Sequence, residues 1–178
     1  NSLVIIGNNE KVWKSTNSGG SFSEINASFS GGTANAGGIA INSSNAYFVV
    51  DGSSDVWMSN NAGISWTKVN DDYNGAAANG INGMDVNSTN SLFIADGQDV
   101  WVSNDSGVSW AKINDDFNGA GDTSNAQLLY VDSKNNIYIP DGTEDIYMSN
   151  NSGTTFALLA SNMNGANAND RGMTSLIQ

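Results

Sequence analysis

Short apolar runs of four or five residues, separated by Asn, Asp, Gly and Ser, recur along the whole chain. One copy of the pattern occupies residues 83–86, 91–95, 99–102 and 109–113, each rich in Val, Ile, Phe or Trp. Runs of this length and composition are typical of β-strands, and no stretch sustains the i, i+3, i+4 apolar spacing of a helix. The pattern therefore predicts an all-β chain built from units of four strands.

Four such units are expected. The first strands of a unit are predicted at 38–41, 84–86, 128–131 and 173–177, and the second at 3–6, 47–50, 92–95 and 137–140. The third are predicted at 11–14, 55–58, 99–102 and 145–148, and the fourth begin at Phe22, Trp66, Trp110 and Phe156. Second strands such as 47–50 are apolar at every position, so each small sheet should be covered on both faces.

An eight-residue motif joins the third strand of each unit to the fourth, with Ser first, Asn or Asp third, Gly fifth and an aromatic residue last. Its four copies place these residues at Ser15, Asn17, Gly19 and Phe22; Ser59, Asn61, Gly63 and Trp66; Ser103, Asp105, Gly107 and Trp110; and Ser149, Asn151, Gly153 and Phe156. The four glycines are separated by steps of 44, 44 and 46 residues. Such regularity indicates one structural unit copied along the chain.

These residues resemble the Asp-box, or BNR, repeat, which occurs in β-propellers such as sialidases, sortilin-type receptors and photosystem assembly factors. The resemblance covers essentially the whole chain and implies that each motif is a turn on the outer side of a blade, with its ring packed between blades. Asn17, Asn61 and Asn151 stand where the family has Asp. Asn keeps the acceptor oxygen of the turn, so we expect a structural role for the motif and no metal there. The motif occurs with unrelated activities and does not itself indicate a function.

Four-stranded units that bury both faces against their neighbours are the blades of a β-propeller. We predict a single four-bladed domain over residues 1–178, with four-stranded antiparallel blades at about 36–74, 80–118 and 126–164 and one made of about 1–30 plus 172–178. The last strand would then complete the first blade and close the ring, leaving no free sheet edge. The alternatives are a fragment of a larger ring and two chains that together form eight blades.

The formal net charge is −12, with only six Lys and Arg among 178 residues. Phosphate recognition needs clustered basic residues, so nucleic acid is not expected as a partner, and no apolar run is long enough for membrane insertion. Cysteine and histidine are absent, which excludes disulfides, thiolate metal sites and histidine catalysis. The Asn- and Ser-rich composition suggests an extracellular location or a virion or cell surface, within a larger surface assembly or appendage.

The loops after the fourth strands are expected on the face opposite the motifs. Two of them carry the candidate ligand-binding residues, which are Asp71, Asp72, Tyr73, Asn74, Asp115, Asp116, Phe117 and Asn118. Carboxylates, amides and rings in this arrangement suit a glycan, a peptide or Ca²⁺. In the alternative interpretation, Asn-Asp and Asp-Gly pairs simply form turns, while Tyr73 and Phe117 cap the blade core. Repetition of the motif favours the structural interpretation.

The function expected from these observations is a non-catalytic binding or structural propeller that presents this loop face to a protein or glycan. The alternative is a carbohydrate-active enzyme resembling glycoside hydrolases. A sialidase-like site would need three arginines, whereas the chain has only Arg171, and Glu10, Glu24 and Glu144 are all expected in polar turns. We therefore assign no catalytic residue, no metal ligand and no cofactor, with Ca²⁺ kept as an option for the loop face.

Overall fold

The computed structural model describes residues 2–7, 9–32, 35–75, 81–119 and 124–161. Within these ranges the chain forms β-strands and no helix. The first antiparallel sheet contains β1 (Leu3–Ile6), β2 (Val12–Ser15) and β3 (Ser23–Asn26), and the second contains β4 (Ala36–Ile41), β5 (Tyr47–Asp51), β6 (Val56–Ser59) and β7 (Thr67–Asn70). The third contains β8 (Ile81–Val86), β9 (Leu92–Asp96), β10 (Asp99–Ser103) and β11 (Ala111–Asn114), and the fourth contains β12 (Tyr130–Val131), β13 (Ile137–Pro140), β14 (Ile146–Ser149) and β15 (Ala157–Ala160).

The strands are ordered in each sheet as they are in the chain, which confirms the predicted all-β units. The first sheet has three strands, because the strand predicted at 173–177 to complete it lies outside the described residues. The strand predicted at 128–131 is shorter than expected, with only Tyr130 and Val131 in β12 and a separate bridge between Ala126 and Asp141. Closure of a ring therefore stays a prediction.

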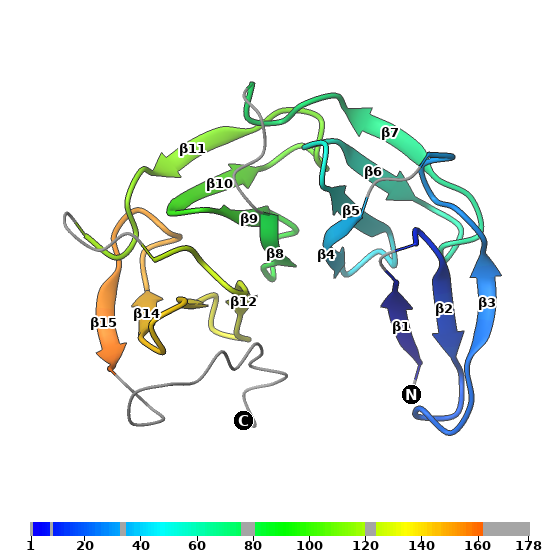
Figure 1. Cartoon of the computed structure of the whole chain (residues 1–178), viewed down its shortest axis with the longest axis horizontal. Coiled ribbons are helices and arrows are strands. Elements are labelled where there is room, and N and C mark those ends of the chain that lie inside the picture. The colour runs from blue at the N-terminus through cyan, green and yellow to red at the C-terminus, as the bar shows by residue number, and fades with distance from the viewer. Residues whose placement is uncertain (1, 8, 33–34, 76–80, 120–123, 162–178) are drawn as a thin grey trace.

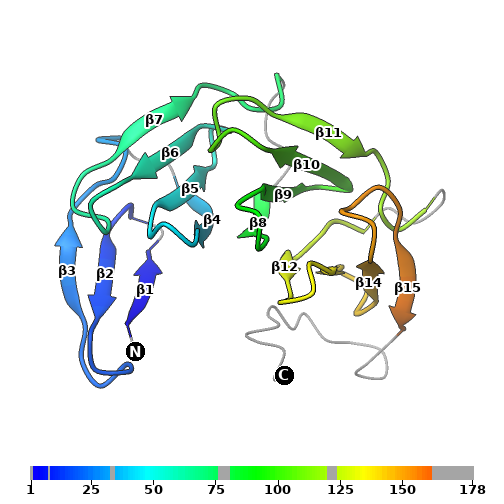
Figure 2. The ribbon, with the colours of Figure 1, turned by 180° about the vertical axis from the view of Figure 1, so that it is seen from behind.

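The four sheets follow one another around an arc, with the first strand of each sheet on the inside and the last on the outside (Figure 1). The sheet of β1–β3 and the sheet of β12–β15 lie at the two ends of this arc, as the reverse view also shows (Figure 2). This arrangement is that of consecutive propeller blades.

Three apolar cores separate the successive sheets. Every residue of β5 and of β9 is buried, which confirms that the continuous apolar runs lie inside on both faces. Phe48 and Val50 face the core shared with the third sheet, while Val49 faces the core shared with the first. Because opposite faces of one strand serve different cores, each inner blade is held by both of its neighbours.

The four predicted motifs form turns of the same geometry, which we call the box turns (residues 15–22, 59–66, 103–110 and 149–156). In the third, Ser103 Oγ accepts a 2.9 Å hydrogen bond from Gly107 N and donates one of 2.8 Å to Asp105 Oδ1. Asp105 Oδ1 also accepts 2.9 Å from Ser109 N. The glycine has a φ of +83°, a left-handed conformation that favours Gly. The equivalent bonds recur in the other three turns, at Ser15, Ser59 and Ser149.

Three of the four box turns, at 59–66, 103–110 and 149–156, also contact the preceding blade. The last residue of an outer strand donates its side-chain amide to a carbonyl of the next box turn, from Asn26 to Ile64, Asn70 to Val108 and Asn114 to Thr154. These bonds span 2.8, 2.8 and 3.1 Å. The box turn is therefore both a local turn and a link between neighbouring blades.

Candidate functional site

The loops after β3, β7 and β11 fold back onto turns of their own sheets, which are the turns between β1 and β2, β5 and β6, and β9 and β10. Backbone N–H groups of Phe29, Tyr73 and Phe117 donate to the carbonyls of Glu10, Ser54 and Gln98 at 3.2, 3.0 and 3.1 Å. The two sets of segments therefore lie on the same side of each sheet. We call the surface formed by residues 51–55, 71–75, 96–99, 115–119 and 125 the loop face.

The eight predicted ligand-binding residues fall into two groups. Tyr73 and Phe117 are only 5% and 3% exposed, whereas Asn74 and Asn118 are half-buried. The four carboxylates are all exposed, at Asp71, Asp72, Asp115 and Asp116.

The two rings pack against the next blade. The Tyr73 ring lies 5.7 Å from that of Trp101 in an edge-on arrangement and 5.6 Å from that of Trp110. Phe117 meets Tyr147 at 5.5 Å and Phe156 at 6.0 Å. Each ring therefore caps the core between two blades, as in the structural interpretation.

A lysine on the outer strand bridges two aspartates in each of the two middle blades. Lys112 Nζ lies 2.8 Å from Asp99 Oδ2 and 2.7 Å from Asp115 Oδ1, and it stands 5.4 Å above the Trp101 ring. The hydrogen bonds that Lys112 donates to Asp115 and Asp99 raise the pKa of its ammonium group.

The second blade repeats this arrangement around Lys68. Its Nζ contacts Asp55 Oδ2 at 2.5 Å and Asp71 Oδ1 at 2.8 Å, and it lies 5.3 Å from the Trp57 ring centre. The hydrogen bond from Lys68 lowers the pKa of the Asp71 carboxyl. The predicted residues Asp71 and Asp115 are therefore the exposed ends of two matching ion-paired clusters.

Asp72 and Asp116 stabilise the loops that carry them. Asp72 Oδ1 accepts a 3.0 Å hydrogen bond from Gly75 N, and Asp116 Oδ1 accepts one of 2.9 Å from Gly119 N. Side-chain acceptors of this kind are typical of Asx turns.

Asp96 connects the second blade to the third. Its Oδ2 accepts from Tyr73 Oη at 2.9 Å and from Asn74 Nδ2 at 2.6 Å, although Asp96 itself is only 3% exposed. Burial and the charge of Asp96 raise the pKa of the Tyr73 hydroxyl, which therefore remains a hydrogen-bond donor. Among the described residues, none is a hydrogen-bond partner of the buried Trp101 Nε1.

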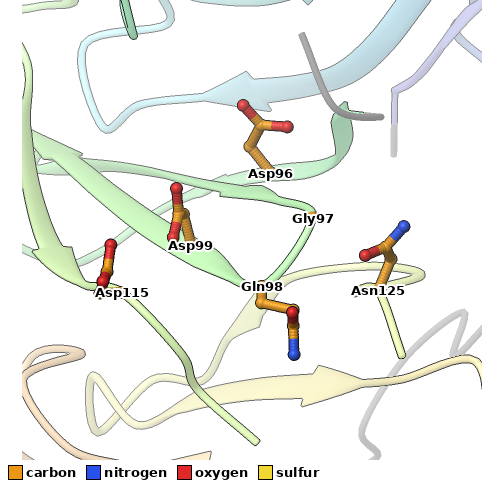
Figure 3. A pocket seen from close by; sticks show the side chains of 6 residues that line it. All are labelled: Asp96, Gly97, Gln98, Asp99, Asp115 and Asn125. Atoms are coloured by element: carbon orange, nitrogen blue, oxygen red, sulfur yellow. The ribbon is translucent and has the colours of Figure 1, made fainter. Parts of the chain in front are cut away.

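A recess of about 340 Å³ lies on the loop face of the third blade. Figure 3 shows Asp99 and Asp115 side by side on one wall, with Asn125 on the opposite wall. Gln98 Nε2 donates a 2.9 Å hydrogen bond to Asn118 Oδ1, which holds the Gln98 side chain in place beside the recess. The recess is lined by Asp96, Gly97, Gln98, Asp99, Asp115 and Asn125. It offers hydrogen-bond acceptors and negative charge, with Lys112 between two of the carboxylates.

The environments of two carboxylates, the buried Glu10 and the half-buried Asp85, were not expected from the sequence. Glu10, placed by prediction in a polar turn, is 1% exposed and accepts hydrogen bonds from Ser28 Oγ and Ser30 Oγ. Burial raises the pKa of Asp85, which accepts backbone N–H groups from Val131 and Val86 at 2.7 and 2.8 Å. The position of Asp85 could have been predicted from the sequence, because it is the one acidic residue in the predicted strand 84–86.

Within the described ranges, no three Asp or Glu residues are arranged to hold a metal ion, and binding of Ca²⁺ stays a prediction. Arg171 lies outside these ranges. The same part of the chain contains no helix of the length and apolarity that a membrane crossing requires.

Comparison with protein families matches residues 54–175 to Sortilin-Vps10, described as sortilin, neurotensin receptor 3. No curated protein matches the chain. The structure is similar to a chain of a nidogen–laminin complex, with a TM-score of 0.70 and 13% identity over 92% of this chain and 63% of that one.

Two further solved structures show the same fold. One is YCF48 bound to D1 peptide, with a TM-score of 0.59 and 13% identity over 88% of this chain and 49% of that one. The other is an ancestral GH74 enzyme, with a TM-score of 0.60 and 21% identity over 87% of this chain and 22% of that one. The chain thus spans less than two thirds of the length of these proteins. At this level of identity the likeness shows the fold alone, and the fold is shared by binding proteins and enzymes.

Proposed function

Because the chain belongs to the Sortilin-Vps10 family of β-propeller domains, we propose that it is a non-catalytic binding module that holds a protein partner on its loop face. The observation that carries this proposal is the recess of the third blade, where Asp99 and Asp115 face Asn125. It is concave, polar and negatively charged, and it lies on a rigid frame of strand ends and paired turns.

The chemistry of the recess selects for a basic segment of the partner. A lysine or arginine side chain can bind the outer oxygens of Asp99 and Asp115, since charge-assisted hydrogen bonds are the stronger ones. The amides of Gln98 and Asn125 can bind backbone groups on either side of that residue. The net charge of −12 would add long-range attraction for a basic partner and speed its association.

Protein binding by related folds supports the choice of partner. YCF48 is bound to D1 peptide and nidogen to laminin in the structures that this chain resembles. A glycan is the second ligand class that the acceptors of the recess would suit. We further assign the four box turns to the Asp-box repeat and place the protein outside the cell or on a virion or cell surface.

The enzyme alternative has support from the GH74 structures, but the carboxylates of the loop face do not suit it. A glycosidase needs one carboxylic acid kept protonated near neutral pH beside a second, ionised carboxylate. Asp99 and Asp115 are instead joined as two equivalent partners of one cation, Lys112. Asp85, whose pKa is raised, lies on the inner strand β8 and accepts two backbone N–H groups there. The non-catalytic function is therefore the better match.

A peptide titration tests the proposal, with blocked fluorescent peptides that are basic, neutral or acidic as probes. The double variant D99N/D115N removes two charges from the recess. The matched control D55N/D71N removes the equivalent pair around Lys68, outside the recess. We expect the basic probe to bind the wild type, to bind D99N/D115N at least tenfold more weakly, and to bind D55N/D71N within about twofold of wild type, since tenfold corresponds to about 1.4 kcal/mol.

Equal losses in the two double variants would show that only net charge matters, and unchanged affinity in D99N/D115N would remove the recess from the binding site. Turnover of a panel of glycosides by the purified chain, abolished by D99N/D115N, would favour the enzyme alternative instead.

A further inference from the structure

The outer strand of the fourth blade differs from the other three outer strands. In each sheet the second residue of the outer strand lies opposite an aromatic residue of the neighbouring strand, as Lys112 does opposite Trp101. This position holds Glu24, Lys68 and Lys112 in β3, β7 and β11, each in an ion pair. In β15 it holds Leu158, opposite Tyr147.

The loss of this charge leaves an unprotected sheet edge. β15 reads Ala157-Leu158-Leu159-Ala160 and pairs only with β14 within the described part of the chain. Leu158 and Leu159 are 53% and 54% exposed. Charged side chains on an edge strand, lysine above all, discourage pairing with another strand. The edges of β3, β7 and β11 have this protection and β15 does not, although all four lie on the outer rim (Figure 1).

Smaller side chains open a recess beside this edge. Trp101, Trp110 and Lys112 cover the junction between the second and third blades. The residues at the equivalent positions of the next junction are Tyr147, Phe156 and Leu158. They line a recess of about 490 Å³ together with Phe117 and, at its polar rim, Asn114, Asp116 and Asn118. The position next to β15 therefore combines an apolar floor with one exposed carboxylate.

We propose that β15 and this recess bind an extended peptide strand of a partner protein. The backbone edge of β15, which has no second strand beside it among the described residues, favours a strand over a helix or a glycan, because an added strand can pair with its N–H and C=O groups. The apolar floor takes one aromatic or aliphatic side chain of that strand. Asp116 and the net charge of −12 favour a basic residue close to it. This surface is separate from the recess of Asp99 and Asp115, and the inference does not depend on the proposed function.

The variant L158K tests this inference by restoring the residue found in β7 and β11. The probe is a short blocked fluorescent peptide that alternates lysine and valine around a central phenylalanine. A second probe has the same sequence with N-methyl groups on alternate backbone nitrogens, which prevents strand pairing. The matched control is I64K, because Ile64 is an equally exposed apolar residue at 63% exposure, far from β15 along the chain.

We expect the first probe to bind the wild type and I64K equally, to bind L158K at least tenfold more weakly, and to lose at least tenfold on N-methylation. The uncharged variant L158Q distinguishes the effect of an added charge from the loss of the apolar side chain. It should also weaken binding, since the amide lacks the apolar contact. Thermal unfolding of each variant checks that the fold is intact. Equal binding of the two probes, or unchanged affinity of both Leu158 variants, would overturn the proposal. Loss in D99N/D115N with no loss in L158K would place the probe in the other recess.

Discussion

Tyr73 Oη donates a 2.9 Å hydrogen bond to Asp96 Oδ2, from a loop of the second blade to a turn of the third. The blade before it has Phe29 in place of the tyrosine, and there the equivalent Asp51 accepts from Trp57 Nε1 at 2.9 Å within its own blade. The corresponding Trp101 Nε1 is buried and has no hydrogen-bond partner within the ranges that the structure describes. The Tyr73 hydroxyl therefore gives Asp96 a hydrogen bond between blades, where Asp51 has one within its own blade.

This difference predicts a small effect of Y73F. Removing the hydroxyl frees part of the Asp96 carboxylate, which can then accept Trp101 Nε1 as Asp51 accepts Trp57. We expect the free energy of unfolding to fall by less than about 1 kcal/mol, against about 3–5 kcal/mol for Y73A, which leaves a cavity in the core. Urea unfolding measures both values. A loss above 2 kcal/mol in Y73F would show that the interblade bond cannot be replaced.

The box turns predict a larger effect of S103A. Ser103 Oγ is the partner of Gly107 N at 2.9 Å in a site where Ser103 is 1% exposed, and alanine would leave that buried N–H without an acceptor. We expect a loss of about 1–3 kcal/mol in unfolding free energy. The control S44A removes an exposed hydroxyl and should change it by under about 0.5 kcal/mol. Similar values for the two variants would contradict a structural role for the serine.

We expect Asp105 to make a pH-dependent contribution to the free energy of unfolding, which the variant D105N lacks. The hydrogen bond from Ser109 Oγ lowers the pKa of Asp105 below its ordinary value of 3.8. A folded-state pKa below the unfolded one adds stability above pH 4, and that stability is lost as the pH falls through the folded-state pKa. Asn61 makes the equivalent bonds to Ser65 N and Ser65 Oγ at 2.9 and 2.8 Å, so asparagine fits the turn.

We therefore expect D105N to match the wild type within about 0.5 kcal/mol at pH 7 and to lose less stability than the wild type between pH 5 and pH 2. Urea unfolding at a series of pH values gives both curves. Parallel curves over this range would show that Asp105 does not contribute to acid unfolding.

Lys112 partly neutralises the recess of the third blade, so its removal should strengthen binding of a basic ligand. K112M keeps the aliphatic stem over Trp101 and frees Asp99 and Asp115 from their shared cation. We expect the basic probe to bind about threefold to tenfold more tightly, or roughly 0.7–1.4 kcal/mol. K68M makes the same change outside the recess and should leave the affinity within about twofold. Equal gains in both variants would indicate a general charge effect.

The fold was largely predictable because its signals are local and repeated. The apolar run 47–50 predicted a strand buried on both faces, and β5 is buried throughout. The spacing of the box glycines predicted four copies of one turn, and the hydrogen bonds at Ser103 recur in all of them. Propensity, turn chemistry and periodicity agree at these positions, so little tertiary information was needed.

The candidate site was less predictable because its chemistry depends on contacts between blades. The sequence around Tyr73 is compatible with a ligand-binding role and with a role in capping the core. Only the packing of its ring on Trp101 and Trp110 shows that it caps the core. The recess beside Leu158 arises from side chains on two blades that are smaller than their counterparts. Asp71 and Asp115 were expected on the surface, but their ion pairs with the lysines three residues earlier, Lys68 and Lys112, were not predicted.

A map of backbone hydrogen–deuterium exchange, recorded with and without the basic peptide probe, tests the central claim most directly. If the acidic recess is the binding site, exchange should slow at residues 96–99 and 115–118 and stay unchanged in the box turns at 59–66 and 103–110. Protection of the box turns, with no change at 96–99, would place the partner on the opposite face and contradict the account.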